Sequence, residues 1–317
     1  MNEFDKNNHL SFLKTLLTMR ILRVYLIALF LVVGLNVNIC AQRVDYLQPT
    51  LQGIVDKYQA TIGFSVLDLE NEKTYSVNGD MHLPMQSVYK FHLGLAVLSQ
   101  VDQRKLSLDQ KILIKKSDLL PDTWSPLRDK YPNGGVKIPL SELISFTVGQ
   151  SDNNGCDILF RLLGGPSKVQ TYIFSLGVQN IAIVATEEEM HKDEKVQFTN
   201  WATPNCSVQL LNLFYKRKVL SEKSHAFLWK VMTESTSGPK KIKGLLPPST
   251  SVAHKTGYSG VNKEGVTASS NDIGIVTMPN GRHFAVAAFV SNTKENDKTI
   301  DSMIAELSKA AWDQLNN

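Results

Sequence analysis

Cysteine is scarce in this sequence, with 3 residues in a chain of 317. Cys40 ends an apolar N-terminal stretch, so the remainder of the chain holds only Cys156 and Cys206. Cys156 falls in an apolar segment of helical pattern, and we interpret both residues as buried free thiols. The sequence therefore predicts no disulfide.

Metal-ligand patterns and an excess of one charge are also missing. The histidines show no metal-binding spacing with Cys, Asp or Glu, so we expect neither a metal ion nor another cofactor. The formal net charge is +4, of which residues 1–41 supply +2 from four basic and two acidic residues. Such a balanced chain predicts no nucleic-acid partner. Repeats and low-complexity linkers are absent, and 43% hydrophobic residues is typical of a globular protein.

The N-terminal region has the pattern of an export signal. An apolar run over Ile21–Ile39 follows two arginines and precedes Ala41. We interpret residues 1–41 as a signal peptide region cleaved after Ala41, with Met19 as an alternative start. The competing interpretation is an uncleaved membrane anchor, because the run is long enough to span a bilayer. Cleavage predicts a periplasmic protein without membrane contact.

Hydrophobic periodicity predicts strands near both ends of the chain and helices between them. The expected strands are 61–67, 73–77, 252–255, 271–277 and 283–290, and the expected helices include 48–58, 91–98, 140–148, 156–163 and 299–317. This order favours an α/β fold of the α+β type, with one sheet built from both ends of the chain and an all-helical part facing it. We expect a single catalytic domain over 42–317, with its α/β part at about 42–84 and 230–317 and its helical part at about 85–229.

An S-x-x-K motif lies at the start of the most apolar predicted helix. Ser87 and Lys90 are three residues apart, so their side chains share one face of the helix. Burial disfavours the charged form of a lysine, and a neutral amine can accept a proton from a serine hydroxyl. The N–H groups at the helix start favour a developing oxyanion. An isolated motif of this kind is more often a helix cap followed by a surface lysine.

Two further short motifs follow. Ser151-Asp-Asn153 supplies a hydroxyl and an amide between two helical segments, although S-D-N alone is typical of a helix N-cap. Lys255-Thr256-Gly257 ends a predicted strand, where a lysine and a hydroxyl can bind a carboxylate and a glycine permits close backbone approach. Each motif is weak by itself.

In the order S-x-x-K, S-D-N, K-T-G, the three motifs resemble those of the class A serine β-lactamases. The resemblance extends over 42–317. Within the class, the sequence is most similar to the PER-type extended-spectrum branch. It implies an antiparallel sheet flanked by helices plus an all-helical domain. It also implies a monomeric serine β-lactamase that hydrolyses penicillins and cephalosporins, small molecules, through an acyl-enzyme and confers antibiotic resistance.

The resemblance assigns roles to individual residues. Ser87 is the nucleophile, Lys90 a general base or proton relay, and Ser151 the donor to the β-lactam nitrogen. Glu187 is the base for deacylation, although an acidic run such as 187–189 is ordinarily solvated, as we expect for Glu188 and Glu189. The implied substrate-binding residues are Asn153 for the acylamido group, Lys255 and Thr256 for the carboxylate, Gly257, Tyr258 for the oxyanion hole together with Ser87, Trp124 at the mouth, Lys241 and His191.

Several of these positions depart from the family pattern or have a plainer interpretation. Ala185 and Asn200 replace a charged pair that joins the ends of the Glu187 loop, and Asp157 replaces an asparagine that braces it. The path of this loop is therefore open. Lys241 lies fourteen residues before Lys255 and either binds the substrate carboxylate or belongs to a solvated lysine cluster.

Two other functions share the three motifs. A penicillin-binding DD-peptidase or transpeptidase does not need a deacylating glutamate. A penicillin-sensing receptor domain is acylated and stays so, and needs a retained membrane segment and a signalling partner.

Overall fold

The computed structural model describes residues 14, 16–21, 23 and 45–316. The predicted cleavage after Ala41 lies outside these residues, as does most of the predicted signal region. Within the described residues, no helix has both the length and the apolar character that a membrane span requires.

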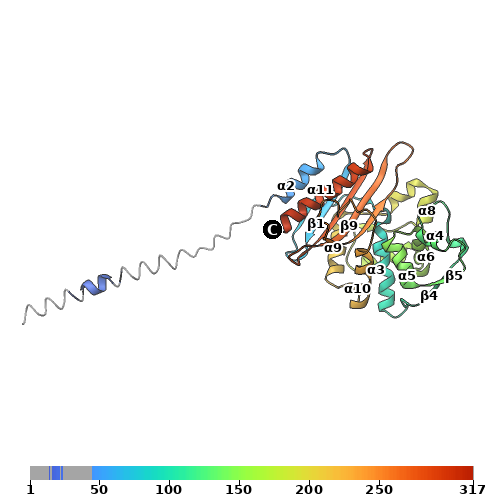
Figure 1. The fold of residues 1–317 in the computed structure, drawn as a ribbon, viewed down its shortest axis with the longest axis horizontal. Helices are drawn as coiled ribbons and strands as arrows, with labels where there is room; N and C mark the ends of the chain where they lie inside the picture. Colours follow the sequence, from blue (N-terminus) through green and yellow to red (C-terminus); the bar gives the residue numbers. More distant parts are fainter. Residues whose placement is uncertain (1–13, 15, 22, 24–44, 317) are drawn as a thin grey trace, which may run out of the picture. The chain divides into compact units, whose positions relative to one another are not determined.

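One antiparallel sheet contains strands from both ends of the chain (Figure 1). Its order is β2-β1-β10-β9-β8. β1 and β10 pair from Thr61 with Ser291 to Asp68 with Phe284, which joins the N-terminal and C-terminal parts of the fold. The predicted antiparallel sheet is confirmed. Its strands are β1 (Thr61–Asp68), β2 (Thr74–Val77), β8 (Ser251–Tyr258), β9 (Thr267–Thr277) and β10 (His283–Thr293).

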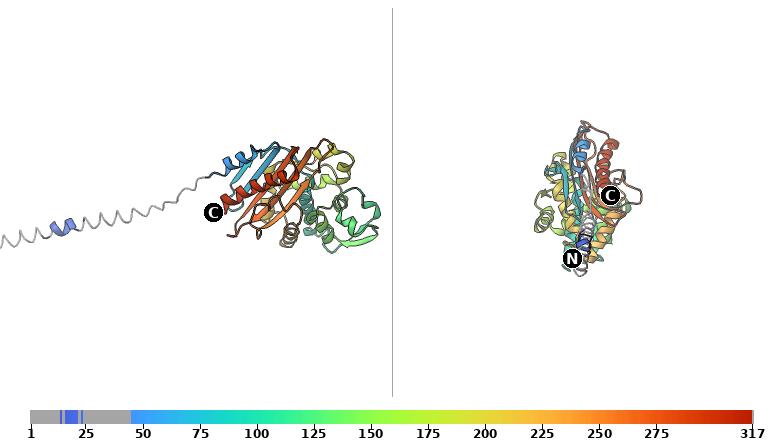
Figure 2. Two further views of the ribbon diagram at one scale, coloured as in Figure 1. Left: turned by 45° about the horizontal axis from the view of Figure 1, so that its top comes forward. Right: turned by 90° about the vertical axis from the view of Figure 1, so that its left-hand side faces the viewer.

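The sheet is buried on both faces. Helices α2 (Leu47–Val55) and α11 (Asp297–Leu315) cover one face, as Figure 2 shows for α11. Because side chains alternate along a strand, β10 supplies residues to two separate cores. Phe284, Val286, Ala288 and Val290 pack with α2 and α11, whereas Ala285, Ala287 and Phe289 pack with the helices of the other face.

The middle of the chain is mostly helical, as predicted. Its helices are α3 (Tyr89–Asp102), α4 (Pro126–Lys130), α5 (Leu140–Ile144), α6 (Asn153–Leu163), α7 (Pro166–Ser175), α8 (Glu187–Lys192), α9 (Pro204–Tyr215) and α10 (Glu222–Thr233). Periodicity missed two small sheets in this region, because their strands are only two to four residues long. They are β3 (Leu83–Pro84) with β7 (Trp201–Ala202) and β6 (Ile181–Ala182), and β4 (Lys111–Ile114) with β5 (Val136–Pro139).

Several predicted boundaries were too narrow. α6 begins at Asn153 rather than Cys156, because Asp152 caps it by accepting from the N–H of Gly155 at 2.7 Å. β9 begins at Thr267 rather than Asn271. Apart from Ala268, its first residues are polar but buried, so hydrophobic periodicity does not reveal them.

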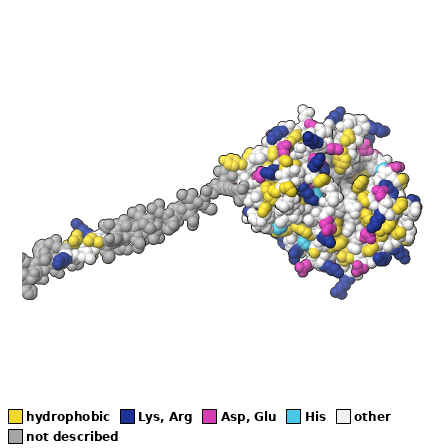
Figure 3. Space-filling view, viewed as in Figure 1, with side chains coloured by type: hydrophobic (Ala, Val, Ile, Leu, Met, Phe, Trp, Pro, Cys, Tyr) yellow, Lys and Arg dark blue, Asp and Glu magenta, His cyan; other side chains and the backbone are white. Residues whose placement is uncertain are grey.

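Cys156 and Cys206 are both buried and free, which confirms the prediction of two free thiols. The Cys156 thiol lies 3.7 Å from the hydroxyl of Tyr89. On the face shown in Figure 3, acidic and basic side chains are interspersed.

Candidate active site

The S-x-x-K motif lies where the sheet meets the helical part. A single 3₁₀ turn, η1 (Gln86–Val88), carries Ser87 and leads directly into α3. Gln86 has φ +48°, a left-handed conformation that a non-glycine residue rarely adopts without support from its surroundings. Asn271 of β9 supplies such support, since its amide donates to the carbonyls of Pro84 and Met85 at 2.8 and 3.0 Å.

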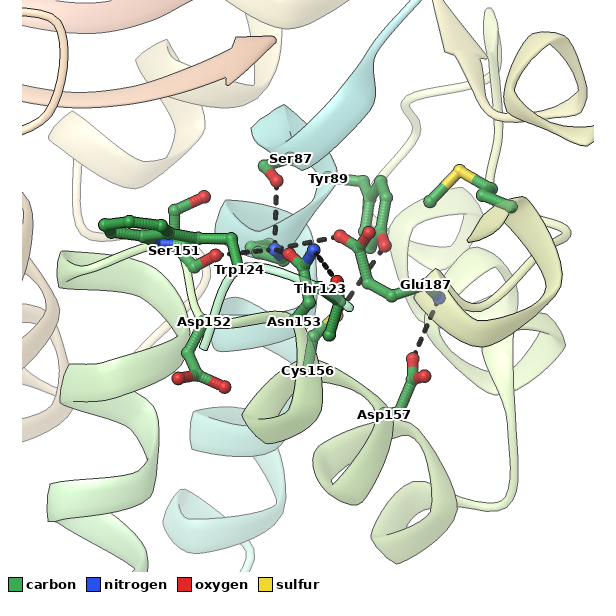
Figure 4. A network of polar contacts seen from close by, with 12 residues as sticks. Ser87, Tyr89, Thr123, Trp124, Ser151, Asp152, Asn153, Cys156, Asp157 and Glu187 are labelled. Carbon is green, nitrogen blue, oxygen red and sulfur yellow. Dashed lines mark hydrogen bonds and ion pairs between the residues drawn. The ribbon is translucent and has the colours of Figure 1, made fainter. Parts of the chain in front are cut away.

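Lys90 is the centre of a buried network of polar contacts, whose other members are labelled in Figure 4. Its Nζ donates to Ser87 Oγ and to the Ser151 carbonyl, each at 2.9 Å, and to Asn153 Oδ1. The same Nζ forms an ion pair with Glu187 Oε1 at 2.8 Å. The structure therefore brings Ser87, Ser151, Asn153 and Glu187 together around the side-chain nitrogen of Lys90, so the five predicted residues form one cluster.

The S-D-N segment follows a π-helical turn, Ser145–Gly149, a feature that is frequent at functional sites. Ser151 has φ +60°. In Figure 4 the Asp152 carboxylate points away from Ser87. It accepts from Leu127 N at 2.6 Å and from the Ser125 hydroxyl. Burial raises the pKa of Asp152 above its ordinary value. Asp152 thus fixes the backbone that presents its two neighbours.

Trp124 belongs to a loop attached to the S-D-N segment. Its carbonyl accepts from Asn153 N at 3.0 Å, and its Nε1 donates to the Gln150 carbonyl at 2.9 Å. The Asn153 amide donates to Thr123 Oγ1 at 2.6 Å. Trp124 is 63% exposed and lines the cavity described below.

Asp157 anchors the start of the Glu187 helix. Its two carboxylate oxygens accept from the backbone N–H groups of Glu187 and Glu188, each at 2.9 Å. Burial, followed by the nearby charge of Glu187, raises the pKa of Asp157 to about 6. A carboxylate therefore braces this loop in the position where the sequence analysis left the bracing open.

Asn200 holds the two ends of the same loop together. Its Oδ1 accepts from Val184 N and Ala185 N at 2.7 and 2.9 Å, and its Nδ2 donates to the Ala185 carbonyl at 2.9 Å. In the family pattern a charged pair joins the two ends of this loop. Here hydrogen bonds from the Asn200 side chain to the backbone join them instead. Because they use the backbone, an alanine at position 185 is sufficient.

The remaining residues of the acidic run differ from one another. Glu188 pairs with Lys192 at 2.8 Å, whereas Glu189 accepts from Thr186 N at 2.8 Å and completes a capping box. The expectation that Glu189 is only solvated was therefore wrong. His191 is exposed on the last turn of α8 and is not among the residues that line the cavity.

Lys255 approaches Ser151 from the edge strand β8. Its Nζ is buried and donates to Ser151 Oγ at 2.9 Å and to the Thr256 carbonyl at 2.6 Å. Burial, followed by the charge of Lys90, lowers the pKa of Lys255 to about 7. This lysine can therefore exchange a proton near neutral pH.

Gly257 allows β8 to lie directly against η1. A Cβ at this position would be 2.4 Å from the Met85 carbonyl oxygen and 3.2 Å from Ser87 N. A side chain would push the two backbones apart. The close approach is thus between two segments of the protein, β8 and η1.

Lys241 is buried, with 7% of its surface exposed. Its Nζ pairs with Asp301 at 2.8 Å and donates to Ser270 Oγ at 2.6 Å. The interpretation of Lys241 as part of a solvated lysine cluster is therefore wrong. Sequence spacing could not reveal the partner, because Asp301 lies 60 residues away in the chain.

These residues surround a cavity of about 450 Å³. Sequence analysis missed Ser237, whose hydroxyl accepts from Thr256 Oγ1 at 3.0 Å, and the two carboxylates of α11. The residues that line the cavity include Ser87, Trp124, Ser151, Asn153, Ser237, Lys241, Thr256, Gly257, Tyr258, Ser270, Asp297 and Asp301.

The arrangement defines a serine hydrolase. A serine hydroxyl contacts a buried lysine, the lysine contacts a carboxylate, and a second lysine contacts a second serine hydroxyl. Such a chain of contacts can move protons to and from a serine that attacks an acyl group.

Comparison with known proteins specifies the class further. A model of the β-lactamase enzyme family matches residues 46–315. The β-lactamase VEB-1 of Pseudomonas aeruginosa is 41% identical over 94% of this chain and 98% of its own length. The extended-spectrum β-lactamase PER-1 of the same species is 41% identical over 84% of this chain and 86% of its own length.

A solved structure agrees with these relatives. The crystal structure of the TLA-3 extended-spectrum β-lactamase superposes with a TM-score of 0.85 at 53% identity, and the match covers 86% of this chain and 99% of that one. The chain belongs to the β-lactamase enzyme family, with the fold of its class A members. It is a serine enzyme of that class, and the resemblance inferred from the three motifs is confirmed.

Proposed function

We propose that the protein hydrolyses the β-lactam ring of penicillins and cephalosporins through an acyl-enzyme on Ser87, and thereby confers antibiotic resistance. The observation that carries this proposal is the contact chain from Ser87 Oγ through Lys90 Nζ to Glu187 Oε1, with distances of 2.9 and 2.8 Å. It couples the nucleophile to a carboxylate that neither a DD-peptidase nor a sensor domain requires.

In acylation, Ser87 Oγ attacks the β-lactam carbonyl and its proton passes to Lys90 or, through it, to Glu187. The backbone N–H groups of Ser87 and Tyr258 stabilise the tetrahedral oxyanion. As the ring C–N bond breaks, Ser151 gives its proton to the leaving nitrogen. Lys255, which contacts Ser151, can replace that proton. The proton taken from Ser87 then returns to the Ser151–Lys255 pair, so Glu187 is a carboxylate again when deacylation begins.

In deacylation, Glu187 removes a proton from a water molecule that attacks the Ser87 ester. The ester C–O bond then breaks, Ser87 Oγ regains a proton, and the opened product leaves as a carboxylic acid. The brace from Asp157 supports this step, because it fixes the backbone N–H of Glu187 itself.

Substrate binding would use the remaining lining residues. Asn153 binds the acylamido group, and Lys255 with Thr256 binds the carboxylate, with Lys241 as a second cation. His191 is exposed, so we assign it no contact with the ring. The relatives named as extended-spectrum enzymes, and a loop held by Asn200 rather than by a charged pair, support action on substrates with bulky side chains.

We further propose that residues 42–317 act as a single catalytic domain, monomeric and periplasmic, after the signal region is removed. The α/β part would comprise about 42–84 and 230–317, and the helical part about 85–229.

Turnover of nitrocefin by the purified protein tests the proposed function. Wild-type protein should hydrolyse many equivalents, and Ser87→Ala none. A DD-peptidase or sensor would instead consume about one equivalent and keep one adduct on Ser87, detectable by intact-mass spectrometry. That result would contradict the proposed hydrolase and favour one of these two alternatives.

A further inference from the structure

The N-terminal part of α11 forms one wall of the cavity. Asp297 and Asp301 are four residues apart on this helix, so both side chains lie on one face. Both line the cavity that also contains Ser87. The motifs that identify the family contain neither residue.

The negative charges of the two carboxylates have different partners. Asp301 pairs directly with Lys241 at 2.8 Å and is 23% exposed. Asp297 accepts from the Tyr258 hydroxyl at 2.9 Å, and no lysine or arginine of residues 45–316 forms an ion pair with it.

The phenol of Tyr258 does not neutralise Asp297. Burial, followed by the hydrogen bond to Asp297 and the charges of Asp297 and Asp301, raises the pKa of Tyr258 to about 12, so the hydroxyl keeps its proton. The wall therefore presents a negative charge to the cavity.

The position of this charge relative to a substrate follows from the proposed function, on which the inference rests. Lys255 and Thr256 would hold the carboxylate, and Asn153 would hold the acylamido group at the opposite end. In a cephalosporin the carboxylate is attached to C4, and the C3 substituent is on the adjacent ring carbon. The C3 substituent therefore extends past the carboxylate site, where Lys241 and α11 form the wall.

We propose that this wall favours cephalosporins whose C3 substituent carries a positive charge, such as a pyridiniomethyl group, and that Asp297 is the specificity-determining residue. Asp297 is exposed, so the attraction is partly screened by water and salt. A solvent-exposed ion pair changes an equilibrium by a factor of about 1.5 to 5. The expected preference is of this size.

The test uses two cephalosporins with the same 2-thienylacetamido group at C7, one with pyridiniomethyl and the other with acetoxymethyl at C3. The ratio of their kcat/KM values is measured for wild type and for Asp297→Asn, whose amide oxygen can still accept from Tyr258. The kcat/KM of the cationic substrate relative to that of the neutral one should fall by a factor of about 1.5 to 5 in the variant. Intrinsic differences in reactivity cancel when the two ratios are compared. The difference between the wild-type ratio and the Asp297→Asn ratio should become smaller in high salt, because salt screens the exposed charge.

Asp109→Asn is the matched control, because it removes the same charge from an exposed residue that does not line the cavity. Its ratio should equal that of wild type. An unchanged ratio in Asp297→Asn, or an equal fall in both variants, would overturn the proposal.

Failure of the proposed function would look different, because the wild type would then turn over neither compound. The rates at which the two compounds acylate Ser87, measured by intact mass, would still give the ratio in that case. Equal ratios in wild type and Asp297→Asn would overturn the inference there too, and absence of any acylation would overturn both proposals.

Discussion

Lys255 and Thr256 are neighbours on the edge strand β8, yet their side chains contact opposite sides of the active site. Lys255 lies against the helical part, where it reaches Ser151. Thr256 lies on the side of α11, where it reaches Ser237. Successive side chains of a strand point to opposite faces, so one strand serves both walls.

The two sides differ in how they treat charge. On the Lys255 side, two lysines are fully buried and Glu187 is in direct contact with one of them. On the Thr256 side Lys241 is buried against Asp301, but Tyr258 is 45% exposed and Asp297 faces solvent. The side that moves protons is enclosed, whereas the side that recognises substrate substituents is open. This difference allows recognition to vary without disturbing proton transfer.

Removing the carboxylate from the enclosed side should have the largest effect. Glu187→Gln should be acylated once and then stall, because the general base that activates water contributes about 10²–10⁴-fold. Intact-mass spectrometry should show a persistent adduct of one substrate mass, which Ser87→Ala lacks.

Glu188→Gln is the control for this experiment, since Glu188 pairs with Lys192 instead of Lys90. It should turn over at nearly the wild-type rate. Wild-type turnover by Glu187→Gln without an adduct would show that another group supplies the base.

Removing a cation from the open side should weaken binding. Lys241→Ala should raise KM by the equivalent of about 1.5–3 kcal/mol, because the cavity loses a charged hydrogen-bond donor. Asp301→Asn keeps the lysine but removes its partner, so KM should change in the opposite direction. If both variants only lower the melting temperature and leave KM unchanged, Lys241 is a structural residue.

Asp157 should make the stability of the enclosed side depend on pH. Its pKa is raised to about 6 from 3.8, so the folded protein binds this proton more tightly than the unfolded chain does. Its contribution to the free energy of unfolding is therefore greatest below about pH 4 and is lost as the pH rises to about 6, by up to about 3 kcal/mol.

The free energy of unfolding, measured in urea from about pH 4 to 6, should decline in wild type through the loss of this contribution. In Asp157→Asn this part of the decline should be absent. Asp129→Asn, which changes an exposed carboxylate, should follow the wild-type curve. Parallel curves for wild type and Asp157→Asn would contradict the prediction.

The last effect concerns Lys255, on the enclosed side. Its pKa of about 7 means that the free enzyme loses this charge as the pH rises. We expect kcat/KM to fall by up to about tenfold for each unit above pH 7, with kcat less affected, because a bound carboxylate restores the proton. Lys255→Arg stays charged and should not show this fall. Identical pH profiles would assign the titration to another group.

The sequence alone determined the parts that depend on local spacing. Ser87 and Lys90 face each other because three residues make nearly one helical turn, and the strands of the sheet follow from alternation of apolar residues. The three motifs together also identified the family. These motifs can be recognised in the sequence because each one lies within a few consecutive residues.

Only the tertiary structure decided how distant groups pair. Asp157 braces Glu187 across 30 residues, Lys241 meets Asp301 across 60, and Tyr258 meets Asp297 across 39. A charged residue has the same local pattern whether it is solvated or paired, so the sequence could not separate these cases. The difference arises because packing of α6 against α8, and of α11 against the sheet, removes water from some of these charges and leaves others exposed.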